Sequence, residues 1–179
     1  MKIIYTGAQS TGKSTILRHY KDLGYPVITE VVRNLSKQGI KVNEQGDTSG
    51  QELIFDTYYD ILSRSKNYIS DRGLTDVLAY TKYLYDRDRV SQRTLNEQIH
   101  SLKIFNQAHS DILYVYFPIE FPVVDDGFRS RDENFREEID KNILDILINN
   151  NIPYLKISGS VEERIKLMDN AMAAATKSK

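Results

Sequence analysis

Cysteine is absent from this 179-residue chain, so the protein forms no disulfide bond and has no thiolate metal site. An excess of charge of either sign is also absent, because 24 Lys and Arg residues face 25 Asp and Glu residues. This balance argues against a general binder of nucleic acid or membrane surfaces. No apolar run approaches the length of a membrane span, and the short apolar segment at the N-terminus does not resemble a secretory signal. We therefore expect a cytoplasmic protein with no membrane or nucleic-acid partner.

The most informative segment lies directly after that short apolar run. Residues 7–14 read GAQSTGKS, which is the complete pattern G-x-x-x-x-G-K-[ST]. In this pattern glycines let backbone N–H groups approach phosphate oxygens, the lysine places positive charge near the β- and γ-phosphates, and the hydroxyl binds Mg²⁺. The helix that begins here points its positive dipole end at the same anion. We predict binding of a nucleoside triphosphate, ATP with Mg²⁺, by Gly7, Gln9, Ser10, Thr11, Gly12, Lys13, Ser14 and Thr15.

Short apolar segments alternate with helical patterns along the rest of the chain. Strands separated by helices predict one α/β domain over 1–179, with a five-stranded parallel sheet covered by helices on both faces. Ligands in such sheets bind at the carboxyl ends of the strands. The C-terminal tail from about residue 173 is expected to be disordered. The strands are expected at about 2–6, 25–29, 67–70, 111–117 and 153–157, an irregular loop at about 40–50, and helices at about 30–38, 51–65, 75–85 and 91–107.

Charged residues follow the second and third predicted strands. Glu30 and Arg33 come after the second strand, and Asp71 and Arg72 end the third. A carboxylate at this edge can accept a proton from a substrate hydroxyl, since phosphoryl transfer depends chiefly on positioning and charge neutralisation. Glu30 and Asp71 are alternative candidates for the base. Asp71 is also a candidate ligand in the magnesium shell. Glu30, Arg33 and Arg72 are candidates for contacts with the substrate. These residues also have plainer interpretations. Glu30 and Arg33 would then form a surface ion pair at the start of a helix, and Asp71 would lie in an ordinary turn.

A segment rich in arginine follows the fourth predicted strand, at about residues 122–136. Its arginines, Arg129, Arg131 and Arg136, suit a lid over the triphosphate, because guanidinium groups form bidentate phosphate contacts and neutralise charge on the transferring group. Asp126 is a candidate for hydrogen bonding to the substrate. The acidic neighbours of these arginines leave open a solvated, salt-bridged helix start.

Several segments together carry a resemblance to a known family. The chain resembles the small P-loop kinases of nucleosides and nucleotides in four segments. These are GAQSTGKST at 7–15, TEVVR at 29–33, Gly50-Gln51 at the start of a helix, and DDGFRSRDENFRE at 125–137. More closely, they are similar to the ribosylnicotinamide kinase domain of the bacterial bifunctional NAD-biosynthesis regulator and the ATPase-like proteins grouped with it. The likeness covers about residues 1–165. It implies a three-layer P-loop NTPase fold with an Arg-bearing lid. Gln51, at the start of the helix after the predicted loop, is a further candidate for substrate binding.

The resemblance implies ATP-dependent phosphorylation of a nucleoside or a nucleoside monophosphate. Its riboside-kinase members usually carry Asp-Thr where this chain has Asp71-Arg72, and the added Arg favours an anionic acceptor. Asp71-Arg72 followed by Ala79-Tyr80 is more weakly similar to thymidylate kinases. We expect Lys13, Arg129 and Arg131 to act on the phosphates, and Ser14 and Asp71 on the metal. A regulatory P-loop ATPase without a small-molecule acceptor is the alternative, and the oligomeric state is open, a homodimer included.

Overall fold

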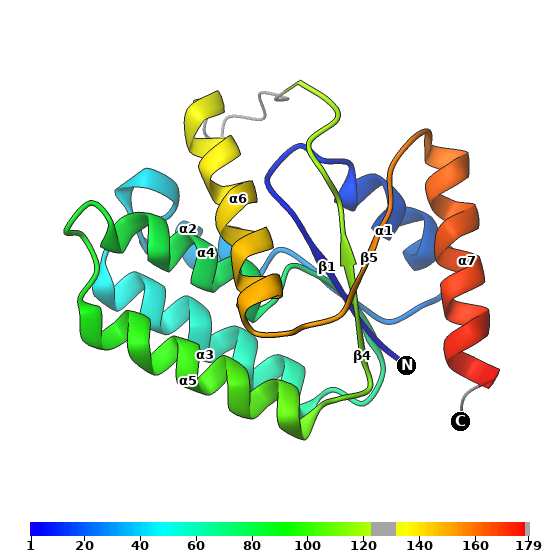
Figure 1. Cartoon of the computed structure of the whole chain (residues 1–179), viewed down its shortest axis with the longest axis horizontal. Helices are drawn as coiled ribbons and strands as arrows, with labels where there is room; N and C mark the ends of the chain where they lie inside the picture. The colour runs from blue at the N-terminus through cyan, green and yellow to red at the C-terminus, as the bar shows by residue number, and fades with distance from the viewer. Residues whose placement is uncertain (123–131, 178–179) are drawn as a thin grey trace.

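The structure, a computed structural model, describes residues 1–122 and 132–177. Within these ranges the chain forms a five-stranded, wholly parallel sheet in the order β2-β3-β1-β4-β5. The sheet confirms the predicted fold class, and helices cover both of its faces (Figure 1). The strands are β1 (Lys2–Thr6), β2 (Val27–Ile28), β3 (Tyr68–Asp71), β4 (Ile112–Tyr116) and β5 (Tyr154–Lys156).

Two apolar clusters form the core, one on each face of the sheet. Successive side chains of β1 point to opposite faces, so Tyr5 packs with α1 (Lys13–Asp22) and α7 (Val161–Lys177), and Ile4 packs on the other side. Because the central strands are buried on both faces, they read as continuous apolar runs. The second cluster is formed with α3 (Thr48–Arg64), α4 (Leu74–Tyr85), α5 (Gln92–Ala108) and α6 (Glu133–Asn149), and α2 (Val31–Lys37) packs against α3.

The register of the sheet brings the functional segments to one edge. Tyr5 of β1 lies opposite Asp71 of β3, and Thr6 lies opposite Tyr116 of β4. The chain leaves β1 directly into the glycine-rich loop at 7–12 and then enters α1. The carboxyl ends of β3 and β4 therefore flank that loop on its two sides.

The helix boundaries differ from the sequence prediction in three places. Within the segment 40–50, expected to be irregular, a 3-10 turn (Asn43–Gln45) is followed by the start of α3 at Thr48. Asp47 caps this helix, because its carboxylate accepts from Gly50 N at 3.0 Å. Helix α7 continues to Lys177, so the tail expected to be disordered from about residue 173 is helical that far. Its alanine-rich sequence has high helix propensity, which explains the difference.

A capping box starts α7, since Ser160 N donates to Glu163 Oε2 at 2.7 Å and Glu163 N donates to Ser160 Oγ at 3.2 Å. Among the described residues, no helix combines the length and apolarity that a membrane crossing requires.

Candidate functional site

The loop between β1 and α1 depends on glycine at two positions. Gly7 has φ 137° and Gly12 has φ 89°, conformations that L side chains rarely adopt. A Cβ on Gly7 would lie 2.4 Å from Phe117 O, a backbone atom next to β4. The sequence predicted these glycines as contact points for phosphate. The structure shows that the loop conformation itself already requires them.

Lys13 lies inside this loop rather than in solvent. Its side chain is buried, and Nζ donates to Gly7 O at 2.8 Å, to Ala8 O at 2.6 Å and to Thr11 Oγ1 at 3.0 Å. The ammonium therefore lies in the concave part of the loop, where an anion would meet it together with the positive end of α1.

Ser14 and Asp71, the two predicted metal ligands, lie side by side. Ser14 Oγ donates to Asp71 Oδ2 at 3.5 Å. The second carboxylate oxygen, Asp71 Oδ1, is buried and has no hydrogen-bond partner among the described residues. Hydroxyl and carboxylate oxygens are ligands that Mg²⁺ accepts, so the pair fits the metal. No cluster of three His, Asp or Glu side chains suited to a metal occurs in the described ranges, so the ion would need phosphate and water ligands as well.

A cavity of about 440 Å³ connects the loop with most of the predicted substrate residues. At one end lie residues 9–16 with Phe121, Val161 and Arg164. At the other end lie side chains from α2, α3, α4 and the segments before them, and they include the predicted Glu30, Arg33, Gln51 and Arg72. Asp71 lies between the two ends in the fold, beside Ser14. The remaining residues of the lining are Val31, Val32, Val42, Asn43, Ile54, Tyr58, Val77 and Tyr80, together with Asp76, which binds the loop.

Glu30 and Arg33 form an ion pair in the lining of this cavity. Arg33 Nε lies 3.2 Å from Glu30 Oε2, and both side chains are partly exposed. Glu30 caps α2 in the left-handed region, with φ 62°. The surface-pair interpretation and the substrate interpretation are therefore compatible, since the pair also lines the cavity.

Gln51 is almost fully buried on α3. Its Oε1 accepts from Thr81 Oγ1 at 3.1 Å, and its backbone oxygen accepts from Gln98 Nε2 at 3.2 Å. With Oε1 bound to α4, the side-chain amide has a defined orientation at the cavity wall.

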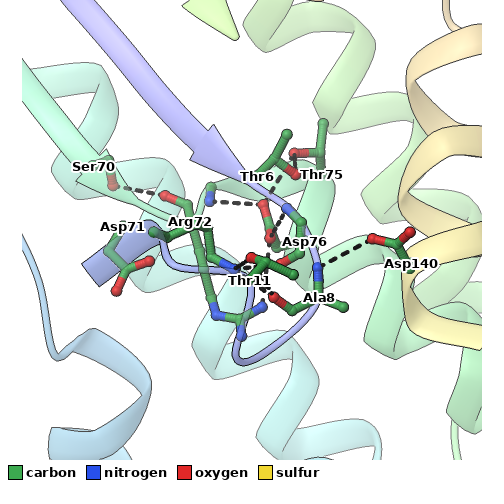
Figure 2. Close-up of polar contacts among 12 residues, drawn as sticks. Thr6, Ala8, Thr11, Ser70, Asp71, Arg72, Thr75, Asp76 and Asp140 are labelled. Atoms are coloured by element: carbon green, nitrogen blue, oxygen red, sulfur yellow. Dashed lines mark hydrogen bonds and ion pairs between the residues drawn. The ribbon is translucent and has the colours of Figure 1, made fainter. Parts of the chain in front are cut away.

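Arg72 is joined to the loop through an aspartate that the sequence analysis missed. Its Nη1 lies 3.4 Å from Asp76 Oδ1, and the same oxygen accepts from Gly7 N at 3.3 Å. Asp76 Oδ2 accepts from Gly73 N at 3.3 Å. Figure 2 shows Asp76 between the end of β1 and the start of α4. Burial raises the pKa of the Asp76 carboxyl, and the positive charges of Arg72 and Lys13 oppose that rise.

Two more residues that bind the loop come from the C-terminal half of the chain. Asp140 on α6 accepts from Ala8 N at 3.4 Å and from Tyr116 OH at 2.6 Å. Arg164 on α7 donates to Thr11 O at 2.7 Å. Neither follows a recognisable motif. Asp76, in contrast, is the third residue of α4, three residues after the N-cap Gly73, which is the spacing at which a capping-box carboxylate accepts from the N-cap N–H.

Arg136 differs from its predicted place. It was expected in a lid over the triphosphate, but it lies in the first turn of α6, is 1% exposed and is not among the residues lining the cavity. Its guanidinium donates to Gln9 O at 3.0 Å and Ser10 O at 3.2 Å, on the outer side of the loop. The other predicted lid residues, Asp126, Arg129 and Arg131, lie outside the described residues.

The comparisons with known proteins agree with this architecture. The model of a family described as AAA domain (AAA_28) matches residues 2–164, most of the chain. The chain belongs to this family. None of the curated proteins matches it.

Solved structures show the same fold at low sequence identity. Deoxyadenosine kinase from M. mycoides, with dCMP and dCDP bound, is 23% identical with a TM-score of 0.69, over 97% of this chain and 99% of that one. NadR protein in complex with NR is 21% identical with a TM-score of 0.71, over 99% of this chain but 52% of that one. YorR protein from Bacillus subtilis is 19% identical with a TM-score of 0.60, over 99% of this chain and 97% of that one. The expected P-loop nucleoside kinase-like fold is thereby confirmed.

Proposed function

We propose that this protein transfers the γ-phosphoryl group of ATP to a hydroxyl of a nucleoside or to the phosphate group of a nucleoside monophosphate. One observation carries the proposal: a single cavity has a polyphosphate-binding loop at one end and a pocket of mixed apolar, aromatic and charged side chains at the other. A nucleoside needs such a pocket, because its base is flat and apolar on its faces while its ribose and base edges form hydrogen bonds. The two ends meet beside Ser14 and Asp71.

The donor end is assigned to this chain's own residues as follows. The loop amides and Lys13 bind the β- and γ-phosphates, and Lys13 exchanges the loop carbonyls it now contacts for phosphate oxygens. Ser14 and Asp71 bind the magnesium shell. The ion, when bound, supplies positive charge that neutralises the phosphate oxygens. Arg129 and Arg131 remain lid candidates on the grounds of sequence.

With a nucleoside as acceptor, the chemical step requires a base at the acceptor end. The acceptor hydroxyl oxygen forms a bond to the γ-phosphorus, the bond from that phosphorus to the β–γ bridging oxygen breaks, and ADP leaves. The hydroxyl proton passes to a carboxylate, for which Glu30 is the better placed candidate because Asp71 is beside Ser14 and assigned to the metal. Gln51, Arg33 and Asp126 are assigned to substrate hydrogen bonds.

The charges at the acceptor end favour an uncharged acceptor over a monophosphate. Arg72 suggested an anionic acceptor when only the sequence was considered. In the structure its guanidinium contacts Asp76, and Arg33 contacts Glu30. Each described arginine of this end therefore has a carboxylate partner already, and an added phosphate would have to compete for it. Relatives with this fold include a deoxyadenosine kinase and NadR bound to NR, which supports a nucleoside.

A panel assay tests the proposal directly. The protein is incubated with Mg-ATP and, one at a time, nucleosides including deoxyadenosine and nicotinamide riboside, and their monophosphates, while ADP formation is measured. We expect ADP formation that depends on a nucleoside, and little with the monophosphates. If only a monophosphate served as acceptor, the kinase activity would stand, and the argument for an uncharged acceptor from the paired arginines would be wrong. ADP formation with no dependence on any acceptor would support the alternative, a regulatory ATPase.

A further inference from the structure

The phosphate loop is bound by two buried arginines that the proposed chemistry does not use. Arg136 comes from α6 and Arg164 from α7, and each is 1% exposed. Arg136 Nε donates to Gln9 O at 3.0 Å and its Nη2 to Ser10 O at 3.2 Å, and Arg164 Nη1 donates to Thr11 O at 2.7 Å. Three successive carbonyl groups of the loop are therefore each hydrogen-bonded to a guanidinium. We call Arg136 and Arg164 the arginine pair.

Because the peptide group is planar, these contacts of the carbonyl oxygens also fix the directions of the neighbouring amide N–H groups. In a trans peptide the C=O of one residue and the N–H of the next point in opposite directions. The oxygens of Gln9 and Ser10 point to Arg136, so the N–H groups of residues 10 and 11 point away from it. Because the loop lines the cavity and Arg136 does not, that direction is toward the cavity. Arg164 lines the cavity next to the loop, and its contact with Thr11 O fixes the orientation of the peptide that carries the Gly12 N–H. The inward amide direction is the one needed to bind an anion.

Both arginines are themselves held in place by further contacts. Arg136 Nη2 also donates to Phe121 O at 2.6 Å, and its Nη1 lies 3.1 Å from Glu133 Oε2. Arg164 Nε donates to Gly159 O at 2.9 Å, and its Nη2 pairs with Glu120. Each guanidinium thus has a carboxylate partner, so its net charge at the loop is largely compensated. The orientation of the donors, more than the charge, is what the pair contributes.

We propose that Arg136 and Arg164 are positioning residues that order the phosphate loop in its anion-binding conformation before any ligand arrives. Preorganised donors bind a ligand without the cost of ordering them at that moment, which raises affinity. The inference rests on the proposed polyphosphate site but needs no phosphoryl transfer. It also explains Gly12, where a Cβ would lie 2.9 Å from Arg164 Nη1.

The first test keeps the charge and removes the geometry. Arg136→Lys and Arg164→Lys each retain one positive charge but lack the planar fork that reaches separate acceptors. Binding of inorganic tripolyphosphate with Mg²⁺ is measured by calorimetry, with Ile143→Val on α6 and Met168→Leu on α7 as controls that perturb the same helices within the core. We expect the Kd to rise at least tenfold in the lysine variants and less than twofold in the controls. Lysine variants that fold and bind within twofold of the wild type overturn the proposal.

The second test does not require the variants to fold. In the ligand-free wild type, ¹⁵N relaxation gives the order parameters of the amides of residues 10–12. Preorganisation predicts rigid-backbone values of about 0.85, and values below about 0.6 overturn it. In folded lysine variants these order parameters should fall while those of α3 stay unchanged. A wild type that binds tripolyphosphate with an ordered loop but phosphorylates no acceptor refutes the proposed function and leaves this inference standing.

Discussion

Replacing Asp76 with Asn removes a negative charge between the phosphate loop and Arg72 while keeping the side-chain volume. Asp76 is 1% exposed, and its two oxygens accept from Gly7 N, Gly73 N and Arg72 Nη1 at 3.3, 3.3 and 3.4 Å. Asn has only one acceptor oxygen. Whichever way its amide is turned, an NH₂ group faces a backbone N–H group, and that buried donor loses its partner.

The expected cost follows from these contacts. A hydrogen bond to a charged group contributes about 1.5–3 kcal/mol, and removing one member of a buried ion pair costs about 3–5 kcal/mol. The second figure is reduced here because the Arg72 side chain is 20% exposed and can gain water. We expect the free energy of unfolding to fall by about 2–4 kcal/mol, which lowers Tm by about 5–15 °C in a domain of this size.

Asp140→Asn is the matched control. Asp140 also binds the loop, since it accepts a hydrogen bond from Ala8 N at 3.4 Å, but its other hydrogen bond comes from Tyr116 OH at 2.6 Å. Arg72 therefore keeps its carboxylate partner in this variant. Urea unfolding and steady-state kinetics are measured for both. Asp76→Asn should raise KM for the acceptor, and Asp140→Asn should leave it unchanged with a smaller loss of stability. If Asp76→Asn unfolds at the wild-type urea concentration and keeps the wild-type KM, the network from loop to acceptor pocket has no energetic role.

Three other substitutions test the donor end. Lys13→Ala should lower kcat/KM for ATP about 100-fold or more in a protein that stays folded by circular dichroism, because a preorganised charge at the phosphates is lost; near-normal turnover would reject the loop assignment. Asp71→Asn keeps a partner for Ser14 but not the charge, so the Mg²⁺ concentration for half-maximal activity should rise about 10- to 100-fold, and an unchanged magnesium titration would exclude Asp71 from the metal shell. Gly7→Ala should destabilise the fold by about 2–5 kcal/mol in urea unfolding, from positive φ and the clash with Phe117 O, whereas wild-type stability would mean that the loop relaxes freely.

The parts of the site predicted correctly are those encoded by neighbouring residues. The loop at 7–14 is contiguous, so its glycines, lysine and serine share one local motif that identifies it without any tertiary information. The strand-end rule then placed Glu30, Arg33 and Asp71 beside it, because parallel strands end at a common edge. The structure confirms that all three line one cavity with the loop, while their chemical roles stay predictions.

The contacts that orient the loop were not predictable in this way. The hydrogen-bonded partners are far apart in the sequence: 69 residues separate Gly7 from Asp76, 132 residues separate Ala8 from Asp140, and 153 residues separate Thr11 from Arg164. Helical periodicity shows which face of a helix is apolar, but not which polar residue at its end meets which backbone group. Arg136 shows the consequence, because its position among other arginines indicated a lid, while the start of α6 directs it to the loop's outer side.

Local sequence was enough to establish the phosphate loop, the alternation of strands and helices, and the sheet edge where ligands bind, since each depends on residues close together in the chain. Packing of α4, α6 and α7 around β1 decided which side chains bind the phosphate loop, because Asp76, Asp140 and Arg164 reach it from distant parts of the chain. The physical reason is that a backbone group of the loop is bound by whichever donor or acceptor the folded chain brings against it, and these groups become neighbours only once the chain has folded.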